Sequence, residues 1–131
     1  MTIAKWTVLA AFMLPVLTVL MTKVATIKQG RRNGGYDNNN PHEWAGKLSG
    51  WHKRAHAAHI NGLEGLPLFA SAVIFAQMAQ ADQARIDMMA MAYIGIRVVY
   101  LGMYLANQGT LRTLVWTAGL ATNVALLLMA A

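Results

Sequence analysis

The stretch RAHAAHINGLEGLPLFASAVIFAQMAQA, residues 54–81, begins polar and ends apolar. Its first turns carry an arginine, two histidines, an asparagine and a glutamate, whereas GLPLFASAVIFAQMAQA (65–81) has no charged residue. A helix needs about 20 mostly apolar residues to cross a bilayer core of about 30 Å. The stretch therefore predicts a transmembrane helix whose leading turns present polar side chains.

Three further long apolar segments accompany it: TVLAAFMLPVLTVLM (7–21), MMAMAYIGI (88–96) with its continuation past Arg97, and TLVWTAGLATNVALLLMAA (113–131). Backbone groups inside lipid must be bonded within their own segment, so the spans are helices. We predict an all-α integral membrane four-helix bundle, a single domain over residues 1–131. Its spans are placed at about 4–27, 57–80, 86–106 and 111–131. The alternative is a soluble four-helix bundle, which needs a wide polar stripe that no segment carries.

Charge predicts the orientation of these spans. The chain has 131 residues, 56% of them hydrophobic, and a net charge of +6. Most lysines and arginines fall between the first two spans, and Arg112 follows the third. The positive-inside rule then places these two connections in the cytoplasm and both termini on the other side. The lack of an organelle signal and the compact chain suggest a bacterial inner membrane.

The excess positive charge is explained by topology and by contact with anionic lipid headgroups, so it gives no reason to expect nucleic-acid binding. No cysteine is present, which excludes disulfides and cysteine catalysis.

The connection at about 28–53 is the only polar segment of any size. A connection this long is usually functional or disordered. Trp44 and Trp51 favour order, because tryptophan suits the headgroup level of a membrane. Two interpretations remain open: a connector that lies along the membrane, and a cap over a site at the cytoplasmic face.

Polar residues gather on one face of each of two predicted helices. At about 100° per residue, Arg54, Asn61 and Glu64 share a sector of about 80° on the second helix. Ionisable residues inside spans usually mark function. The third helix has a matching face within about 60°, formed by Tyr93, Arg97, Tyr100 and Tyr104.

Glu64 and Arg97 can pair across these two faces, and the three phenols can add donors. One interpretation is a polar clamp that fixes the register of the helices. The other is a pocket for a charged ligand whose apolar part lies in the membrane.

His52, His56 and His59 lie on the opposite side of the second helix. Spacings of four and three can present metal ligands. Membrane di-iron oxygenases, however, use many more than the four histidines of this chain. We expect these histidines to face the membrane interface or to hold hydrogen bonds at the start of the helix, and we predict no metal site.

The pattern R-A-x-x-x-x-x-N-x-x-E-x-x-P-L-F, then R-x-x-Y-x-x-x-Y, then L-R, resembles the membrane-associated proteins in eicosanoid and glutathione metabolism, the MAPEG family. The microsomal glutathione transferases belong to it. The resemblance covers most of the chain. It implies a homotrimer that binds glutathione as co-substrate between subunits, near the cytoplasmic face, and acts on a hydrophobic small molecule reached from membrane lipid.

The resemblance also implies roles for individual residues. Arg112 looks like the arginine that stabilises the glutathione thiolate, with Tyr100 or Tyr104 as an additional donor. The remaining candidates are expected to bind glutathione: Arg54, Asn61, Glu64, Tyr93, Arg97, and Arg31 or Arg32 from the first connection. The implied activity is that of a glutathione transferase or peroxidase acting on a lipophilic electrophile or a lipid hydroperoxide.

The chain departs from the family pattern at two points. Ala57 stands where several members carry a glutathione-binding arginine, and the spacing from Tyr104 to Arg112 is one residue longer than in leukotriene-C synthase. A non-catalytic trimeric relative that binds lipid or another ligand is therefore an alternative. A small multidrug transporter is a second alternative, although its membrane-embedded glutamate belongs in the first span, where this chain has no acid.

Overall fold

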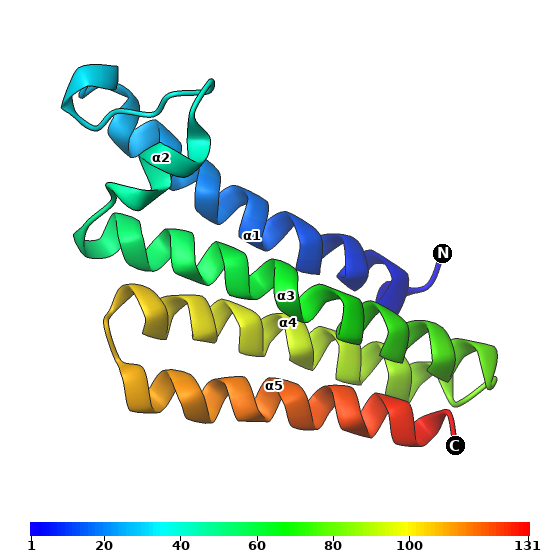
Figure 1. Ribbon diagram of the computed structural model, residues 1–131. Coiled ribbons are helices and arrows are strands. Elements are labelled where there is room, and N and C mark those ends of the chain that lie inside the picture. Colours follow the sequence, from blue (N-terminus) through cyan, green and yellow to red (C-terminus); the bar gives the residue numbers. More distant parts are fainter.

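The computed structural model describes residues 1–131 and consists of helices alone. Four long helices run side by side, and both termini lie at the same end of the bundle (Figure 1). The elements are α1 (Ile3–Ile27), the 3₁₀ turn η1 (Arg31–Asn33), α2 (Pro41–Gly46), α3 (Gly50–Met78), α4 (Gln83–Leu105) and α5 (Gly109–Met129). This confirms the predicted all-α four-helix bundle.

Each of the four long helices is long and apolar enough to cross a membrane. Large apolar side chains such as Trp6, Leu17 and Met78 are more than half exposed on the outside of the bundle. The interior combines small residues, with Ala4, Ala72 and others fully buried, and a few large apolar side chains, Phe69, Ile86 and Leu126. Small interior residues and an apolar exterior are typical of membrane helices, which gain little from hiding large apolar groups from lipid.

Helices α3 and α4 form the middle of the bundle, because α1 packs on both of them and α5 packs on both of them. The face that α1 presents inward contains threonines, whose hydroxyls bond back to their own helix: Thr18 donates to the Leu14 carbonyl at 2.8 Å. Such bonds satisfy hydroxyl groups within the segment, as an apolar surrounding requires.

Helices α1 and α3 approach closely at Pro15 and Gly62. A Cβ atom added to Gly62 would lie 2.9 Å from the Pro15 Cβ. One turn earlier on α3, His59 Nδ1 lies 2.8 Å from the Pro15 carbonyl oxygen, which it bonds in its Nδ1–H tautomer. Glycine at position 62 therefore sets how closely the two helices approach.

The first connection is ordered and largely folded against α1 and α3. Trp44 on α2 is 4% exposed, and its Nε1 donates to Thr26 Oγ1 at 3.1 Å. Tyr36 meets the Trp44 ring edge to face at 4.9 Å. The Trp44 ring is buried, whereas Trp51 is 39% exposed, and the expectation that both tryptophans lie at headgroup level stays a prediction.

Two contacts fix the ends of the bundle. Asp87 Oδ1 accepts from the Ala4 backbone N–H at 2.8 Å, so a side chain of α4 caps the first turn of α1. At the other end, Arg54 Nε donates to the Leu105 carbonyl at 3.2 Å. A cation at this position also favours the negative end of the α4 dipole.

Candidate functional site

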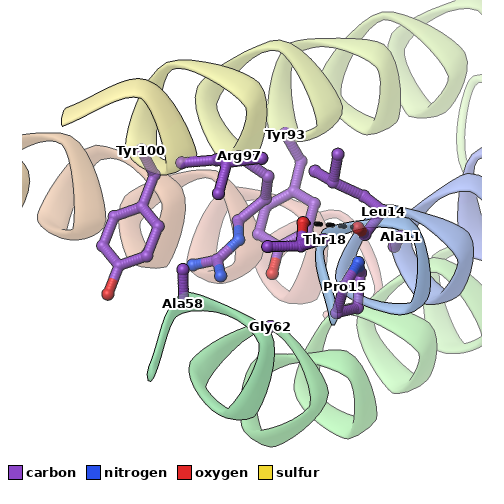
Figure 2. Close-up of a pocket in the computed structure, with 10 residues that line it drawn as sticks. Ala11, Leu14, Pro15, Thr18, Ala58, Gly62, Tyr93, Arg97 and Tyr100 are labelled. Atoms are coloured by element: carbon purple, nitrogen blue, oxygen red, sulfur yellow. Dashed lines mark hydrogen bonds between the residues drawn. The ribbon is translucent and has the colours of Figure 1, made fainter. Parts of the chain in front are cut away.

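Arg97 joins the polar faces of α3 and α4. Its guanidinium crosses from α4 to α3, where Nη2 donates to Asn61 Oδ1 at 3.0 Å. Figure 2 shows the guanidinium extending between the helices toward Ala58 on α3. Arg97 is only 9% exposed. A nearly buried cation with a neutral partner leaves most of its charge available to an anionic ligand.

The predicted pairing of Glu64 with Arg97 is wrong. The structure has two ion pairs, Arg31 with Asp37 and Lys47 with Glu43, and both lie in the first connection. Glu64 is exposed on the single chain. On the helical projection it lies at the edge of the polar face, about 60° from Asn61, so Arg97 meets the nearer asparagine instead.

The tyrosines of α4 line a continuous ridge beside Arg97. The Arg97 guanidinium lies over the Tyr100 ring, 4.3 Å from its centroid. Tyr100 meets Tyr104 edge to face at 5.6 Å. Tyr93, one turn deeper, is 4% exposed and stacks on Phe69 at 4.0 Å. The ridge therefore runs from the packed core to the α4–α5 end of the bundle.

Arg112 lies at the outer end of this ridge. Its guanidinium is 4.3 Å from the centroid of the Tyr104 ring, a cation–π contact that fixes it at the start of α5. It borders a hollow of about 310 Å³ that we call the outer cavity. The outer cavity is lined by Asn61, Tyr100, Tyr104, Arg112, Thr113 and Trp116.

A second hollow of about 210 Å³, which we call the deep cavity, continues from the outer one. The two share Asn61 and Trp116. The deep cavity is lined by Asn61, Glu64, Gly65, Leu68, Tyr93, Arg97, Trp116, Gly119, Leu120 and Asn123. On the α1 side of Arg97, the hollow of Figure 2 has room for about 20 Å³, which suits a single water molecule.

The other predicted ligand residues lie apart from these cavities. Arg54 lines neither cavity and is bonded to the end of α4. Arg31 and Arg32 lie on η1 and are exposed. Arg31 Nε is 3.7 Å from Asp37 Oδ1. Hydrogen bonds from the Asn40 side chain and the Asn39 backbone, together with Arg31, lower the pKa of Asp37 below its ordinary value of 3.8.

Two histidines of α3, His56 and His59, face α1 and the first connection. His59 is bonded to Pro15, and His56 lies 6.0 Å from the Trp44 ring and 5.9 Å from the His59 ring, between centroids. No group of three or more His, Cys, Asp or Glu residues is arranged to hold a metal ion. These histidines pack α3 against its neighbours.

Five residues of α5 that border the cavities were not among the predicted site residues: Thr113, Trp116, Gly119, Leu120 and Asn123. Asn123 is 4% exposed, and its Oδ1 has no hydrogen-bond partner. The sequence could have pointed to Asn123, because a polar amide side chain within an apolar transmembrane span usually has a functional or structural role.

The model of the MAPEG family matches residues 3–131, essentially the whole chain. No curated protein and no solved structure matches the chain.

Proposed function

The chain belongs to the MAPEG family, and on that premise we propose that it is a glutathione transferase or peroxidase. It is an integral membrane protein of the family of glutathione and eicosanoid metabolism. The proposed reaction joins a glutathione thiolate to a lipophilic electrophile or reduces a lipid hydroperoxide. We treat residues 1–131 as one transmembrane domain.

The observation that carries this proposal is the charge pattern of the two cavities. Arg97 and Arg112 supply two cations and Glu64 supplies one carboxylate. Glutathione has two carboxylates, one ammonium group and a thiol, so Arg97 suits one carboxylate, Glu64 suits the ammonium group, and Arg112 remains for the thiolate. Arginine is suited to carboxylates because its planar guanidinium offers paired donors. Asn61, shared by both cavities, adds an amide for the peptide backbone.

Arg112 is the proposed activating residue. A thiol of pKa about 8.5 ionises more readily beside a cation, and the thiolate is the nucleophile. In the transferase reaction the sulfur forms a bond to carbon as the leaving group departs with the bonding electrons.

In the peroxidase reaction the thiolate attacks one peroxide oxygen and the O–O bond breaks. The alkoxide takes a proton to become an alcohol, and a second glutathione converts the sulfenic acid to disulfide and water. Tyr100 or Tyr104 is the proposed proton donor, since both line the outer cavity beside Arg112.

A homotrimer is part of the proposal. Glu64 is exposed on the single chain, and both cavities open at its surface. A charged side chain facing lipid is costly. A neighbouring subunit placed against α3 and α5 would cover Glu64 and close the cavities, which supports the site between subunits that the family resemblance implies.

The orientation of the chain in the membrane is also part of the proposal. The first connection and the α4–α5 turn lie at one end of the bundle, and the termini lie at the other (Figure 1). The basic first connection marks its end as cytoplasmic by the positive-inside rule. In a bacterial inner membrane, the outer cavity would then receive glutathione from the cytoplasm, and the lipophilic substrate would arrive from the bilayer past Trp116.

The decisive experiment is ultraviolet detection of the thiolate when glutathione is added to the purified protein at neutral pH. A signal in the wild type that disappears in Arg112→Ala supports the proposal. No signal in the wild type would contradict it and favour a non-catalytic, lipid-binding member of the family.

A further inference from the structure

The outward side of α1 carries a row of exposed apolar side chains, which we call the α1 stripe. Its members, Leu17, Leu20, Val24 and Ile27, are between 44% and 66% exposed. Because they are spaced three and four residues apart, they share one side of the helix. The buried threonines of α1 lie on the opposite side, which faces the bundle. The α1 stripe is therefore a surface for lipid.

The length of the α1 stripe matches one leaflet of a bilayer. Ten residues separate Leu17 from Ile27, and at 1.5 Å per residue they cover about 15 Å. This is half of a bilayer core of about 30 Å. Ile27 is the last residue of α1. The residues that follow it are therefore expected at the level of the lipid headgroups.

Two exposed cations follow the α1 stripe directly. Lys28 is the C-cap of α1, and Arg32 lies on η1. The turn between them stays close to the helix, because the Gly30 backbone N–H donates to the Ile27 carbonyl at 3.4 Å. Neither cation forms an ion pair, since both ion pairs of the chain involve other basic residues. Their charges are therefore available to an anion beside the end of α1.

Most other basic side chains at this end of the bundle are engaged within the protein, by an ion pair, an aromatic ring or a backbone carbonyl. The engaged residues are Lys23, Arg31, Lys47, Arg54 and Arg112. Lys53 on α3 is exposed and has no acidic partner, so it adds to the positive potential here. The combination of free cations and a lipid-facing apolar surface is therefore found at the end of α1.

We infer that the end of α1 binds an anionic phospholipid, with Lys28 and Arg32 at its phosphate group and the α1 stripe against an acyl chain. The guanidinium offers paired donors to phosphate oxygens, and the ammonium group adds a compact charge. The neighbouring subunit of the proposed trimer lies against α3 and α5, which leaves this side of α1 open to lipid. The inference does not depend on the proposed reaction, because Lys28 and Arg32 line neither cavity.

The test compares two lipids that differ only in the charge of the headgroup. Phosphatidylglycerol and phosphatidylcholine with identical palmitoyl and oleoyl chains are titrated into the full-length protein in detergent, without glutathione, and native mass spectrometry counts the bound lipid. We expect phosphatidylglycerol to bind at least about tenfold more tightly, because each basic residue near the headgroups contributes about fivefold. A higher ammonium acetate concentration should reduce this preference, since the site is exposed to solvent.

Variants of equal charge assign the preference to the end of α1. Lys28→Gln with Arg32→Gln should remove most of it. Lys5→Gln with Arg85→Gln is the matched control, because it removes the same charge from two exposed positions at the opposite end of the bundle, and it should keep the preference (Figure 1). Equal binding of the two lipids, a preference that survives the loss of Lys28 and Arg32, or an equal loss in the control would overturn the inference.

Discussion

Arg97 on α4 donates to Asn61 on α3 across 3.0 Å, and this single hydrogen bond joins the two polar faces of the bundle. The pair lies where the outer and deep cavities meet, since Asn61 lines both. The same contact therefore fixes the register of α3 against α4 and positions a cation for a ligand. The polar clamp between helices and the ligand pocket, which the sequence left as alternatives, are therefore two roles of the same pair of residues.

Replacing Asn61 separates these roles. Asn61→Leu leaves the nearly buried Arg97 without its partner and should lower the stability of the protein in detergent by about 1–3 kcal/mol. Asn61→Asp restores a partner but neutralises the charge of Arg97, so it should keep the melting temperature and lose glutathione affinity. Thermal unfolding and calorimetric titration measure the two effects. Equal glutathione affinity in Asn61→Asp and the wild type would show that Arg97 does not bind the ligand.

Arg112 is predicted to control the ionisation of bound glutathione. A nearby opposite charge typically lowers a pKa by about 1 to 3, so Arg112→Ala should reduce the thiolate fraction at neutral pH by about tenfold or more. Arg112→Lys keeps the charge but loses the planar group that lies over Tyr104, and an intermediate effect is expected. A spectrophotometric pH titration of the thiolate tests both variants. An unchanged titration curve in Arg112→Ala would remove the assignment.

The crossing at Gly62 gives a prediction about the fold alone. Gly62→Ala places a Cβ 2.9 Å from the Pro15 ring, so α1 and α3 must move apart, and a loss of about 1–3 kcal/mol is expected. Gly95→Ala on α4 is the matched control, because a Cβ there meets nothing within 4 Å. That variant should gain about 0.5–1 kcal/mol from helix propensity. If the two variants melted at the same temperature, close contact at the crossing would be refuted.

The face shared by Arg97, Tyr100 and Tyr104 was predictable, because one helical turn places residues three and four apart together. The rotation of α5 about its own axis could not be predicted in this way. On a helix that contacts lipid on one side and small apolar residues on the other, both sides are apolar, so the periodic pattern does not show which side faces inward. The inward position of Asn123 therefore depends on packing against α4. The pairing expected for Glu64 failed for a related reason, since a shared sector does not determine which of its members is closest.

Asp37 supplies a prediction about pH outside the membrane. The Asn40 amide, the Asn39 backbone N–H and Arg31 lower its pKa in the folded protein below the ordinary value of 3.8. A group whose pKa is depressed stabilises the fold above its unfolded pKa, and this contribution is lost as the pH falls through the folded value. The order of the first connection should therefore be unaffected at neutral pH and weaken progressively as the pH falls through 3.8 toward the lower pKa of the folded state. A carboxyl NMR titration that gives Asp37 a pKa at or above this value would contradict the contacts.

Ala57 offers a gain-of-function prediction. It lies one turn before Asn61 on α3, where several family members carry an arginine that binds glutathione. Ala57→Arg adds a cation beside the proposed ligand site, and because glutathione has a net negative charge, we expect binding to tighten by about tenfold. Ala57→Leu adds comparable bulk without charge and should not tighten it. Calorimetric titration of glutathione at two salt concentrations measures the effect, and the gain should shrink at the higher concentration because the site opens to solvent. Tighter binding in the leucine variant as well would show that packing of α3, and not the added charge, limits the affinity.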